Sequence, residues 1–239
     1  MKTKSSLLKN NAFQSLISSL ICVLLGLLVG YIVLLFINPG GAWEAIKAVI
    51  KNFFFYPAGP ARAKYFGNTL VKAAPLVMCS LSILFAYKVG LFNIGVAGQY
   101  AAGAGISLYA ALSLNMPWWA CLLLGMLAGA ILGTVSGALK AYCNVNEVIS
   151  GIMLNWITLY GMNDLLSKVK EPTSPYTVHI EGVNPDAIIP NLGLDKLFNN
   201  NQYVTIAIPI SIILAFVIYV IMEKTKFGYE LKATGFNKN

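Results

Sequence analysis

The sequence predicts an all-α protein: a polytopic transmembrane helical bundle of about six spans with a cytoplasmic N-terminus. Two observations lead to this fold class. Of the 239 residues, 57% are hydrophobic and only 11% are charged, whereas a soluble domain carries about 25% charged residues because its surface meets water. Uncharged stretches of about 20 residues, the length that crosses roughly 30 Å of hydrocarbon as a helix, also recur along the chain. We therefore expect lipid around most of the molecule.

Six apolar stretches account for the predicted helices, and together they make residues 1–239 a single transmembrane domain. The first contains no charged residue, the third is rich in glycine and the fifth is short. The predicted spans are residues 15–37, 69–87, 92–114, 118–139, 148–164 and 203–222.

The connections between these spans differ greatly in length. Residues 38–68 and 165–202 are expected to form external loops, and residues 223–239 a cytoplasmic segment. Apolar residues recur at helical spacing in the first loop, at Trp43, Ile46, Val49, Ile50 and Phe53. This spacing is typical of an amphipathic helix that lies at the membrane interface.

The formal net charge of +8 fits the proposed orientation. Lysine and arginine accumulate in the cytoplasmic segments of membrane proteins, and Lys2, Lys4 and Lys9 precede the first span. The basic residues do not form a run interleaved with aromatic side chains, as a nucleic-acid groove would require. We therefore expect a lipid bilayer, and no nucleic acid, as the partner of this charge.

The sequence contains no recognisable catalytic or metal-binding constellation. Its cysteines, Cys22, Cys79, Cys121 and Cys143, are far apart and the lone His179 has no neighbouring cluster of ligands. Neither a nucleophile motif nor a phosphate-binding G-x-x-x-x-G-K-[ST] loop is present. We expect that the chain is not an enzyme and holds no metal or cofactor, so any ATP hydrolysis would occur on another subunit.

The fourth span carries a glycine at every fourth residue: Gly125, Gly129, Gly133 and Gly137. Helices in a bilayer associate through close backbone approach, and small residues on one face permit it. We interpret this stripe as a helix-packing surface.

Polar residues enter the third span in the segment GLFNIGVAGQYAAGAG, where Asn93 and Gln99 lie among Gly95 and Gly98. Unwound backbone is tolerated in a membrane only in buried or water-lined places. One interpretation is therefore a broken or re-entrant helix that presents two amides to a polar solute. The other is hydrogen bonding between helices combined with glycine packing. The residues alone leave both interpretations open.

The fifth span begins NVNEVISGIMLNW, in which Asn146 is a good N-cap and Glu147 favours the positive end of the helix dipole. Gly151, Asn155 and Thr158 continue from Glu147 at helical spacing. This small or polar stripe is expected to face the bundle interior, where Asn155 meets either a partner or a substrate.

Three segments, GLFNIGVAGQ, NEVISGIMLNWI and KTKFGYELKATGFN, resemble the permease subunits of ABC importers for nucleosides and simple sugars. These belong to the larger branched-chain amino-acid permease superfamily. The resemblance implies a second permease subunit, ABC ATPase subunits and an extracytoplasmic solute-binding protein as partners, in a bacterial cell membrane. The substrate pathway that it implies comprises Asn93, Gly95, Gly98, Gln99 and Asn155.

The terminal segment looks like the family's cytoplasmic coupling segment, which seats in a cleft of the ATPase. The coupling residues that this implies are Phe227, Gly228, Glu230, Leu231, Gly235 and Phe236. An ordinary basic juxtamembrane tail is the alternative. Permeases of this family usually continue past GFN with about four further spans, so we expect this chain to be a truncated form.

Three further functions remain open at this stage. An ion-coupled secondary carrier usually has ionisable residues near the membrane midplane, and the predicted spans have no central carboxylate. A branched-chain amino-acid permease is a second alternative, ranked lower because of the NIGVAGQ motif. A membrane scaffold fragment without transport activity is the third.

Overall fold

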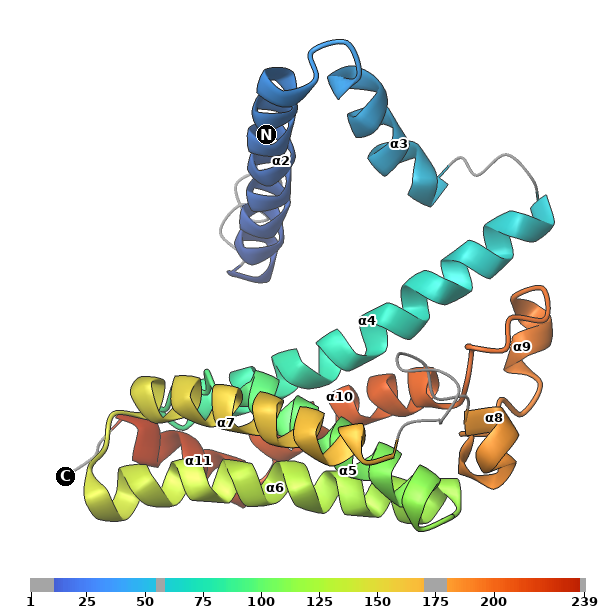
Figure 1. Cartoon of the computed structure of the whole chain (residues 1–239). Helices are drawn as coiled ribbons and strands as arrows, with labels where there is room; N and C mark the ends of the chain where they lie inside the picture. The colour runs from blue at the N-terminus through green and yellow to red at the C-terminus, as the bar shows by residue number, and fades with distance from the viewer. Residues whose placement is uncertain (1–10, 55–58, 170–179, 237–239) are drawn as a thin grey trace. The chain divides into compact units, whose positions relative to one another are not determined.

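A computed structural model describes residues 11–54, 59–169 and 180–236, and every regular element among them is a helix (Figure 1). This confirms the predicted all-α class. The chain divides into two compact units, Met1–Arg62 and Ala63–Asn239. Each unit is described by itself.

The first unit consists mainly of one long apolar helix, α2 (Asn11–Ile37), followed by α3 (Ala42–Phe54). The α2 helix contains no charged residue. Its apolar side chains are nevertheless largely exposed, and that of Leu24, for example, is 64% exposed. Such an apolar exterior suits a lipid environment. The α2 helix includes the predicted first span.

The α3 helix confirms the amphipathic helix that was predicted within residues 38–68. The chain turns at Asn38, whose Oδ1 accepts a hydrogen bond from the Gly41 amide at 3.1 Å. The Tyr31 and Trp43 rings then meet edge to face with their centroids 6.3 Å apart. Lys47 bonds Glu44 at 2.8 Å, which lowers the pKa of that exposed carboxyl. The side chain of Phe53 lies outside the described residues.

The next helix, α4 (Gly59–Lys88), begins ten residues before the predicted second span. This helix therefore begins within the segment predicted to be the first external loop. A tertiary contact lies at this end: Asn201, which is fully buried, donates from Nδ2 to the Lys64 carbonyl at 3.0 Å and to Asn68 Oδ1 at 2.8 Å. A Cβ atom on Gly67 would lie 3.0 Å from Asn201 Nδ2, so the first turns of α4 pack closely against the same asparagine.

The α5 (Val96–Ser113), α6 (Trp118–Cys143) and α7 (Glu147–Ser167) helices pack against one another, with α5 in contact with both others (Figure 1). Asn146 caps α7 as predicted, because its Oδ1 accepts a hydrogen bond from the Val148 amide at 2.9 Å. The preceding helix ends at Asn144, which adopts a left-handed conformation with φ of 51°. These two asparagines make the sharp connection between α6 and α7.

Short helices occupy part of the predicted external loop at 165–202: α8 (Ile180–Val183), the 3-10 turn η1 (Pro185–Ala187) and α9 (Leu194–Leu197). The loop is anchored to the end of α5 by Asn184. Its buried Nδ2 donates to the carbonyls of Ala111 and Met116, both at 2.9 Å. His179 lies outside the described residues.

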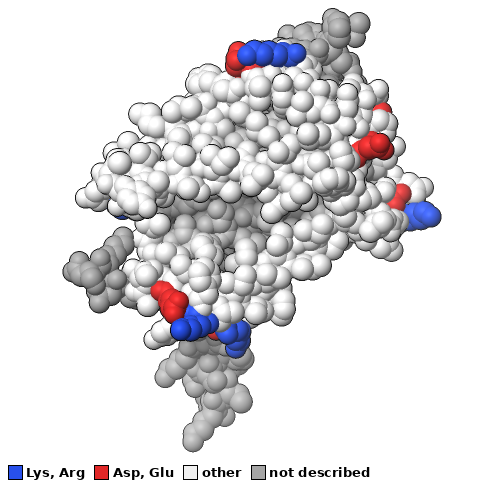
Figure 2. Space-filling view, turned by 90° about the horizontal axis from the view of Figure 1, so that it is seen from below, with Lys and Arg blue, Asp and Glu red and all other residues white. Residues whose placement is uncertain are grey.

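The chain continues through α10 (Ala207–Lys224) and α11 (Lys226–Phe236). Within the described parts of the chain, four helices are long and apolar enough to cross a membrane, in the ranges Phe13–Ile37, Ala61–Lys88, Trp118–Cys143 and Ala207–Lys224. Figure 2 shows one face of the molecule, on which nearly all atoms belong to uncharged residues. These features are those of a multi-pass membrane protein. The count of about six spans stays a prediction. The cytoplasmic location of the N-terminus also stays a prediction, and residues 1–10 lie outside the described part of the chain.

We predict that Asn201→Ala destabilises the second unit. The change leaves the Lys64 carbonyl and Asn68 without their buried donor, and such a loss costs about 1–3 kcal/mol. Thermal unfolding in detergent should show a lower midpoint. The matched control is Asn163→Ala, at an exposed position of α7, which should leave the midpoint unchanged; equal midpoints for both variants would contradict the role of Asn201.

Candidate functional site

The chain between α4 and α5 is not helical, although the predicted third span started at residue 92. Gly90 turns the chain with φ of +78°, a conformation that favours glycine, and α5 becomes regular only at Val96. The polar residue Asn93 lies in this unwound segment. The first residues of the predicted third span are therefore part of the connection between α4 and α5, and the broken or re-entrant helix stays a prediction.

Asn155 of α7 repairs the backbone hydrogen bonding at this break. Its Oδ1 accepts from the Gly98 amide at 2.7 Å, and its Nδ2 donates to the Ile94 carbonyl at 3.0 Å. In a regular helix the Gly98 amide would donate directly to the carbonyl four residues earlier, which is that of Ile94. Because the first amides of any helix have no partner within the helix, the carboxamide of Asn155 acts here as a cap for the first turn of α5.

Glycines on both helices permit this insertion. A Cβ atom on Gly98 would lie 2.7 Å from Asn155 Oδ1 and 3.0 Å from Asn155 Cα. On α7, a Cβ on Gly151 would lie 2.9 Å from the amide nitrogen of Gly95. Since real Cβ atoms avoid such distances, the two backbones can approach closely only with glycine at 98 and 151.

Asn93 and Gln99 face each other across the unwound segment and form an amide pair. Asn93 Nδ2 donates to Gln99 Oε1 at 3.2 Å, and Gln99 Nε2 donates to Asn93 Oδ1 at 3.3 Å. Asn93 Nδ2 also lies 3.0 Å from Ser82 Oγ of α4. The amide pair is half-buried, so it remains within reach of a solute.

The amide pair lines a cavity of about 320 Å³, which we call the polar hollow. Lys140 and Glu147 contribute an ion pair of 2.9 Å to its wall. Its described lining residues are Ser82, Phe85, Ala86, Leu91, Phe92, Asn93, Gln99, Gly133, Ser136, Gly137, Lys140 and Glu147. Amides and hydroxyls supply both donors and acceptors, and two phenylalanines supply flat apolar surface. The lining of the hollow thus combines hydrogen-bonding groups, an ion pair and apolar rings.

The structure separates the predicted pathway residues into two groups. Asn93 and Gln99 lie together in the hollow, whereas Gly95 and Gly98 lie at the crossing of α5 and α7. Asn155 is not among the described residues that line the hollow, because the α5 backbone engages both of its amide atoms. Asn155 was expected to meet either a partner within the bundle or a substrate, and in the structure it bonds the backbone of α5.

The four glycines of the stripe on α6 also fall into two groups with different surroundings. A Cβ on Gly125 would lie 2.8 Å from the carbonyl oxygen of Gly103, and one on Gly129 would lie 3.3 Å from that of Gln99. These two glycines therefore let α5 approach α6. Gly133 and Gly137 instead line the polar hollow, and at Gly137 no described atom comes within 4 Å of the Cβ position. The packing predicted for the whole stripe is wrong at Gly137 within the described chain.

Several lining residues were not predicted from the sequence. Glu147 was assigned only to the start of α7, yet its carboxylate meets Lys140 across the α6–α7 connection. Opposite charges at the adjoining ends of two consecutive helices could have indicated this pair. Ser82 and Ser136 give no comparable signal, because lone serines are common in membrane helices.

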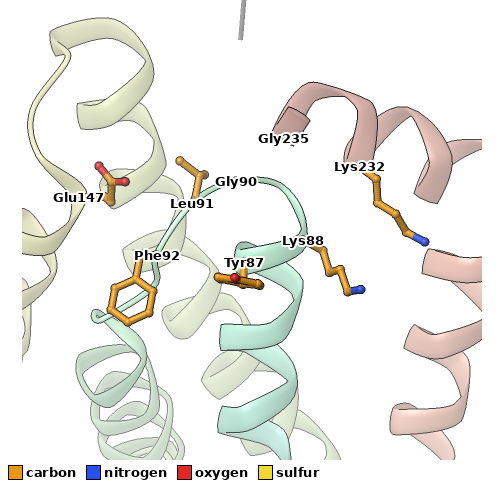
Figure 3. Close-up of a pocket in the computed structure, with 8 residues that line it drawn as sticks. All are labelled: Tyr87, Lys88, Gly90, Leu91, Phe92, Glu147, Lys232 and Gly235. Carbon is orange, nitrogen blue, oxygen red and sulfur yellow. The ribbon is translucent and has the colours of Figure 1, made fainter. Parts of the chain in front are cut away.

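A second cavity, of about 530 Å³, lies between the α4–α5 turn and the end of α11, and we call it the terminal hollow (Figure 3). Its described lining residues are Tyr87, Lys88, Gly90, Leu91, Phe92, Glu147, Lys232 and Gly235. Figure 3 shows the turn at Gly90 beside the chain at Gly235. The two hollows share Leu91, Phe92 and Glu147 and so flank the unwound segment.

The predicted coupling residues belong to α11, a helix that folds tightly onto α10. Gly228 has no room for a Cβ, which would lie 2.6 Å from Met222 Cα. Phe227 remains 58% exposed. Glu230 pairs with Lys226 at 3.6 Å on the exposed surface, and Leu231 is half-buried. The side chain of Phe236 lies outside the described residues, and among the described residues no group of metal-ligating side chains is found.

The bundle, its unwound segment and the polar hollow define a membrane protein of the permease class. Residues 65–239 match the family model of the permease component of branched-chain amino acid transport systems. The chain belongs to this family. No solved structure gives a significant match.

Curated relatives carry more specific names. The chain is 31% identical to the nucleoside ABC transporter permease protein NupB of Lactococcus lactis, over 95% of this chain and 63% of that protein. It is 28% identical to the guanosine ABC transporter permease protein NupP of Bacillus subtilis, over 94% and 62%. The glucose ABC transporter permease protein TsgB13 of Haloferax volcanii is 29% identical, over 72% and 48%. The chain thus spans about three fifths of the length of the first two relatives.

We predict that Asn155→Ala lowers the stability of the bundle. The Gly98 amide and the Ile94 carbonyl both lose their partner, and each buried unpaired group costs about 1–3 kcal/mol. Chemical or thermal unfolding in detergent would measure the loss.

Asn155→Asp separates the two bonds, because a carboxylate keeps the acceptor for Gly98 and loses the donor to Ile94. That carboxylate would also place a charged oxygen against the Ile94 carbonyl oxygen, so Asn155→Asp should be no more stable than Asn155→Ala. Wild-type stability in both variants would show that Asn155 does not hold the break.

Proposed function

We propose that the chain is the membrane-spanning permease part of an ATP-driven importer that translocates a nucleoside or a simple sugar. The observation that carries this proposal is the half-buried amide pair of Asn93 and Gln99 in the polar hollow. Family membership and the names of the nucleoside, guanosine and glucose relatives support it.

The chemistry of the polar hollow favours this class of solute. A nucleoside or sugar is uncharged and carries several hydroxyls, which can exchange hydrogen bonds with water for bonds to carboxamides at little net cost. Phe85 and Phe92 offer apolar faces for a base or for the flat side of a sugar ring. The amide pair satisfies itself when no solute is present, so the empty hollow need not hold unpaired polar groups.

The proposal includes partners. Hydrolysis of ATP would take place on separate ATPase subunits, a second permease subunit would complete the pathway, and a solute-binding protein would deliver the cargo outside. The α11 helix is the proposed contact for the ATPase, since Phe227 and Tyr229 are exposed aromatic side chains, 58% and 75% respectively, at a segment that the family resemblance assigns to coupling.

An ion-coupled carrier is less well supported. Such a carrier needs an ionisable group that can take up and release its ion within the membrane. The carboxylate that lines the polar hollow, Glu147, lies 2.9 Å from the Lys140 ammonium. This pairing favours a structural role for both charges.

We predict that Asn93→Ala and Gln99→Ala each reduce uptake about tenfold, since a hydrogen bond worth about 1–1.5 kcal/mol corresponds to roughly that factor. The measurement is uptake of a radiolabelled nucleoside, with unlabelled glucose as competitor, by the full-length permease assembled with its ATPase and binding protein. The amount of assembled complex should not change.

Asn163→Ala, at an exposed position on α7, is the matched control and should retain full uptake. Unchanged uptake in Asn93→Ala and Gln99→Ala would remove the amide pair from the pathway. Uptake that is absent in the wild type for every nucleoside and sugar offered would favour the scaffold alternative.

A further inference from the structure

The external loop packs one of its sides firmly against α4. Residues 190–206, which we call the anchored loop, contain the fully buried Asn201 and the buried Val204. A Cβ on Gly67 of α4 would lie 3.0 Å from Val204 Cγ2 and 3.1 Å from Phe198 Cβ. The Phe198 ring also lies 6.2 Å from the Phe66 ring, between centroids. Figure 1 shows α9, which belongs to this loop, beside the first half of α4. The anchored loop is therefore held in one position on the helix.

The two ends of the anchored loop are joined, and one of its turns is strained. The Ile206 amide donates to the Pro190 carbonyl at 3.1 Å, which closes the base of the loop. Near the start of the loop, Leu192 and Gly193 adopt left-handed conformations with φ of 47° and 85°. This conformation is unfavourable for a bulky residue such as leucine, and strain of this kind clusters at functional sites. We therefore expect a contact that compensates for the strained position of Leu192.

The outward side of the anchored loop is apolar. The side chains of Leu192, Leu197 and Tyr203 are 79%, 72% and 71% exposed. In the same loop, Asn201 is fully buried. A loop surrounded by water usually exposes its amides and buries its leucines. The arrangement here is the reverse, and it suits surroundings that are themselves apolar.

The anchored loop lies at the depth of the membrane interface. Asn201 bonds Lys64 and Asn68, and the predicted second span begins at residue 69. At 1.5 Å per residue, these contacts lie about 2–8 Å before the span along α4, and the headgroup layer is about 5–7 Å thick on each side of the hydrocarbon. Tyr203 precedes the start of α10 at Ala207, and tyrosine is enriched at this level of membrane proteins. Both helices therefore place the loop in the headgroup layer.

The charges of the anchored loop favour a lipid partner over a protein partner. The charged residues between 190 and 206 are Asp195 and Lys196, which are adjacent and of opposite sign. The loop thus offers no charged patch that would orient a protein. Binding to an interface depends instead on the apolar area that enters it. The exposed leucines and the tyrosine supply this area.

We propose that the anchored loop inserts into the lipid surface at the start of α4 and α10. Leu192 and Leu197 reach the ends of the acyl chains, and Tyr203 lies among the headgroups. The lipid contact compensates for the left-handed backbone of Leu192. The inference concerns the external segment alone and does not rest on the proposed function.

The first experiment measures the surroundings of the leucines in a bilayer. The full chain, freed of its native cysteines, is placed in nanodiscs of phosphatidylethanolamine and phosphatidylglycerol with a nitroxide at Leu192→Cys or Leu197→Cys. The ratio of collision rates with oxygen, which enters lipid, to those with a water-soluble nickel chelate should be at least threefold higher than at Asp186→Cys. Asp186 is an exposed residue of η1 in the same external segment and serves as the matched control.

Two results would overturn the proposal. A ratio at residues 192 and 197 as low as at Asp186→Cys would place the loop in water. Low collision rates with both reagents would show that protein covers the loop, whether a second copy of the chain, a further segment of a longer permease or a solute-binding protein. Both labels replace exposed side chains, so the labelled chains should keep the elution profile of the wild type.

A second variant tests the strained leucine without a label at its position. Leu192→Gly removes the apolar side chain and suits the left-handed conformation. It should lower the collision ratio at Leu197→Cys at least twofold, while the thermal midpoint in detergent is equal to that of the wild type or higher. An unchanged ratio at residue 197 would contradict the insertion of Leu192.

Discussion

The structure depends on one constraint: a backbone amide or carbonyl at membrane depth must have a hydrogen-bond partner, because hydrocarbon offers none. At the start of α5 the Gly98 amide has no carbonyl of its own helix to donate to, and the Ile94 carbonyl precedes the helix. Asn155 supplies the missing donor and acceptor from a neighbouring helix. With that one side chain in place, both of these backbone groups are hydrogen-bonded where α5 begins.

The unwound segment in turn makes a polar site possible. A continuous helix from residue 92 would bond its own backbone and leave no gap between α4 and α5. Here the break lets Asn93 turn toward Gln99, and hollows open on both sides of Leu91 and Phe92. Glycines at the crossing of α5 with α7 and with α6 keep the helices close enough for these contacts. Packing and function are therefore linked through a few small residues.

Composition and local pattern were sufficient to predict the all-α membrane class, the amphipathic helix α3 and the N-cap at Asn146. These features depend on neighbours within about one helical turn, which a single sequence displays directly. The break at the start of α5 was one of two interpretations, because its glycines and amides fit either. The sequence could indicate polar residues there but not which of them line the polar hollow and which bond the backbone.

The features that sequence reasoning missed all depend on contacts between distant residues. Asn201 bonds Lys64 and Asn68 of α4, more than 130 positions earlier in the chain. Asn155 reaches Gly98 across 57 positions, and Lys140 meets Glu147 only because two asparagines make a sharp connection. Gly137 belongs to the same four-residue glycine repeat as Gly125, but it lines the polar hollow instead of packing against α5. Spacing identifies a helix face, and only the fold identifies what that face meets.

Site-resolved hydrogen exchange of the Gly98 amide in the intact permease tests the central claim most directly, because that amide donates to Asn155 in this account. We expect it to be protected in the wild type and to exchange at least tenfold faster in Asn155→Ala, while amides in the middle of α5 keep their protection. If the Gly98 amide stays equally protected after the substitution, it donates within its own helix, and the break held by Asn155 does not exist.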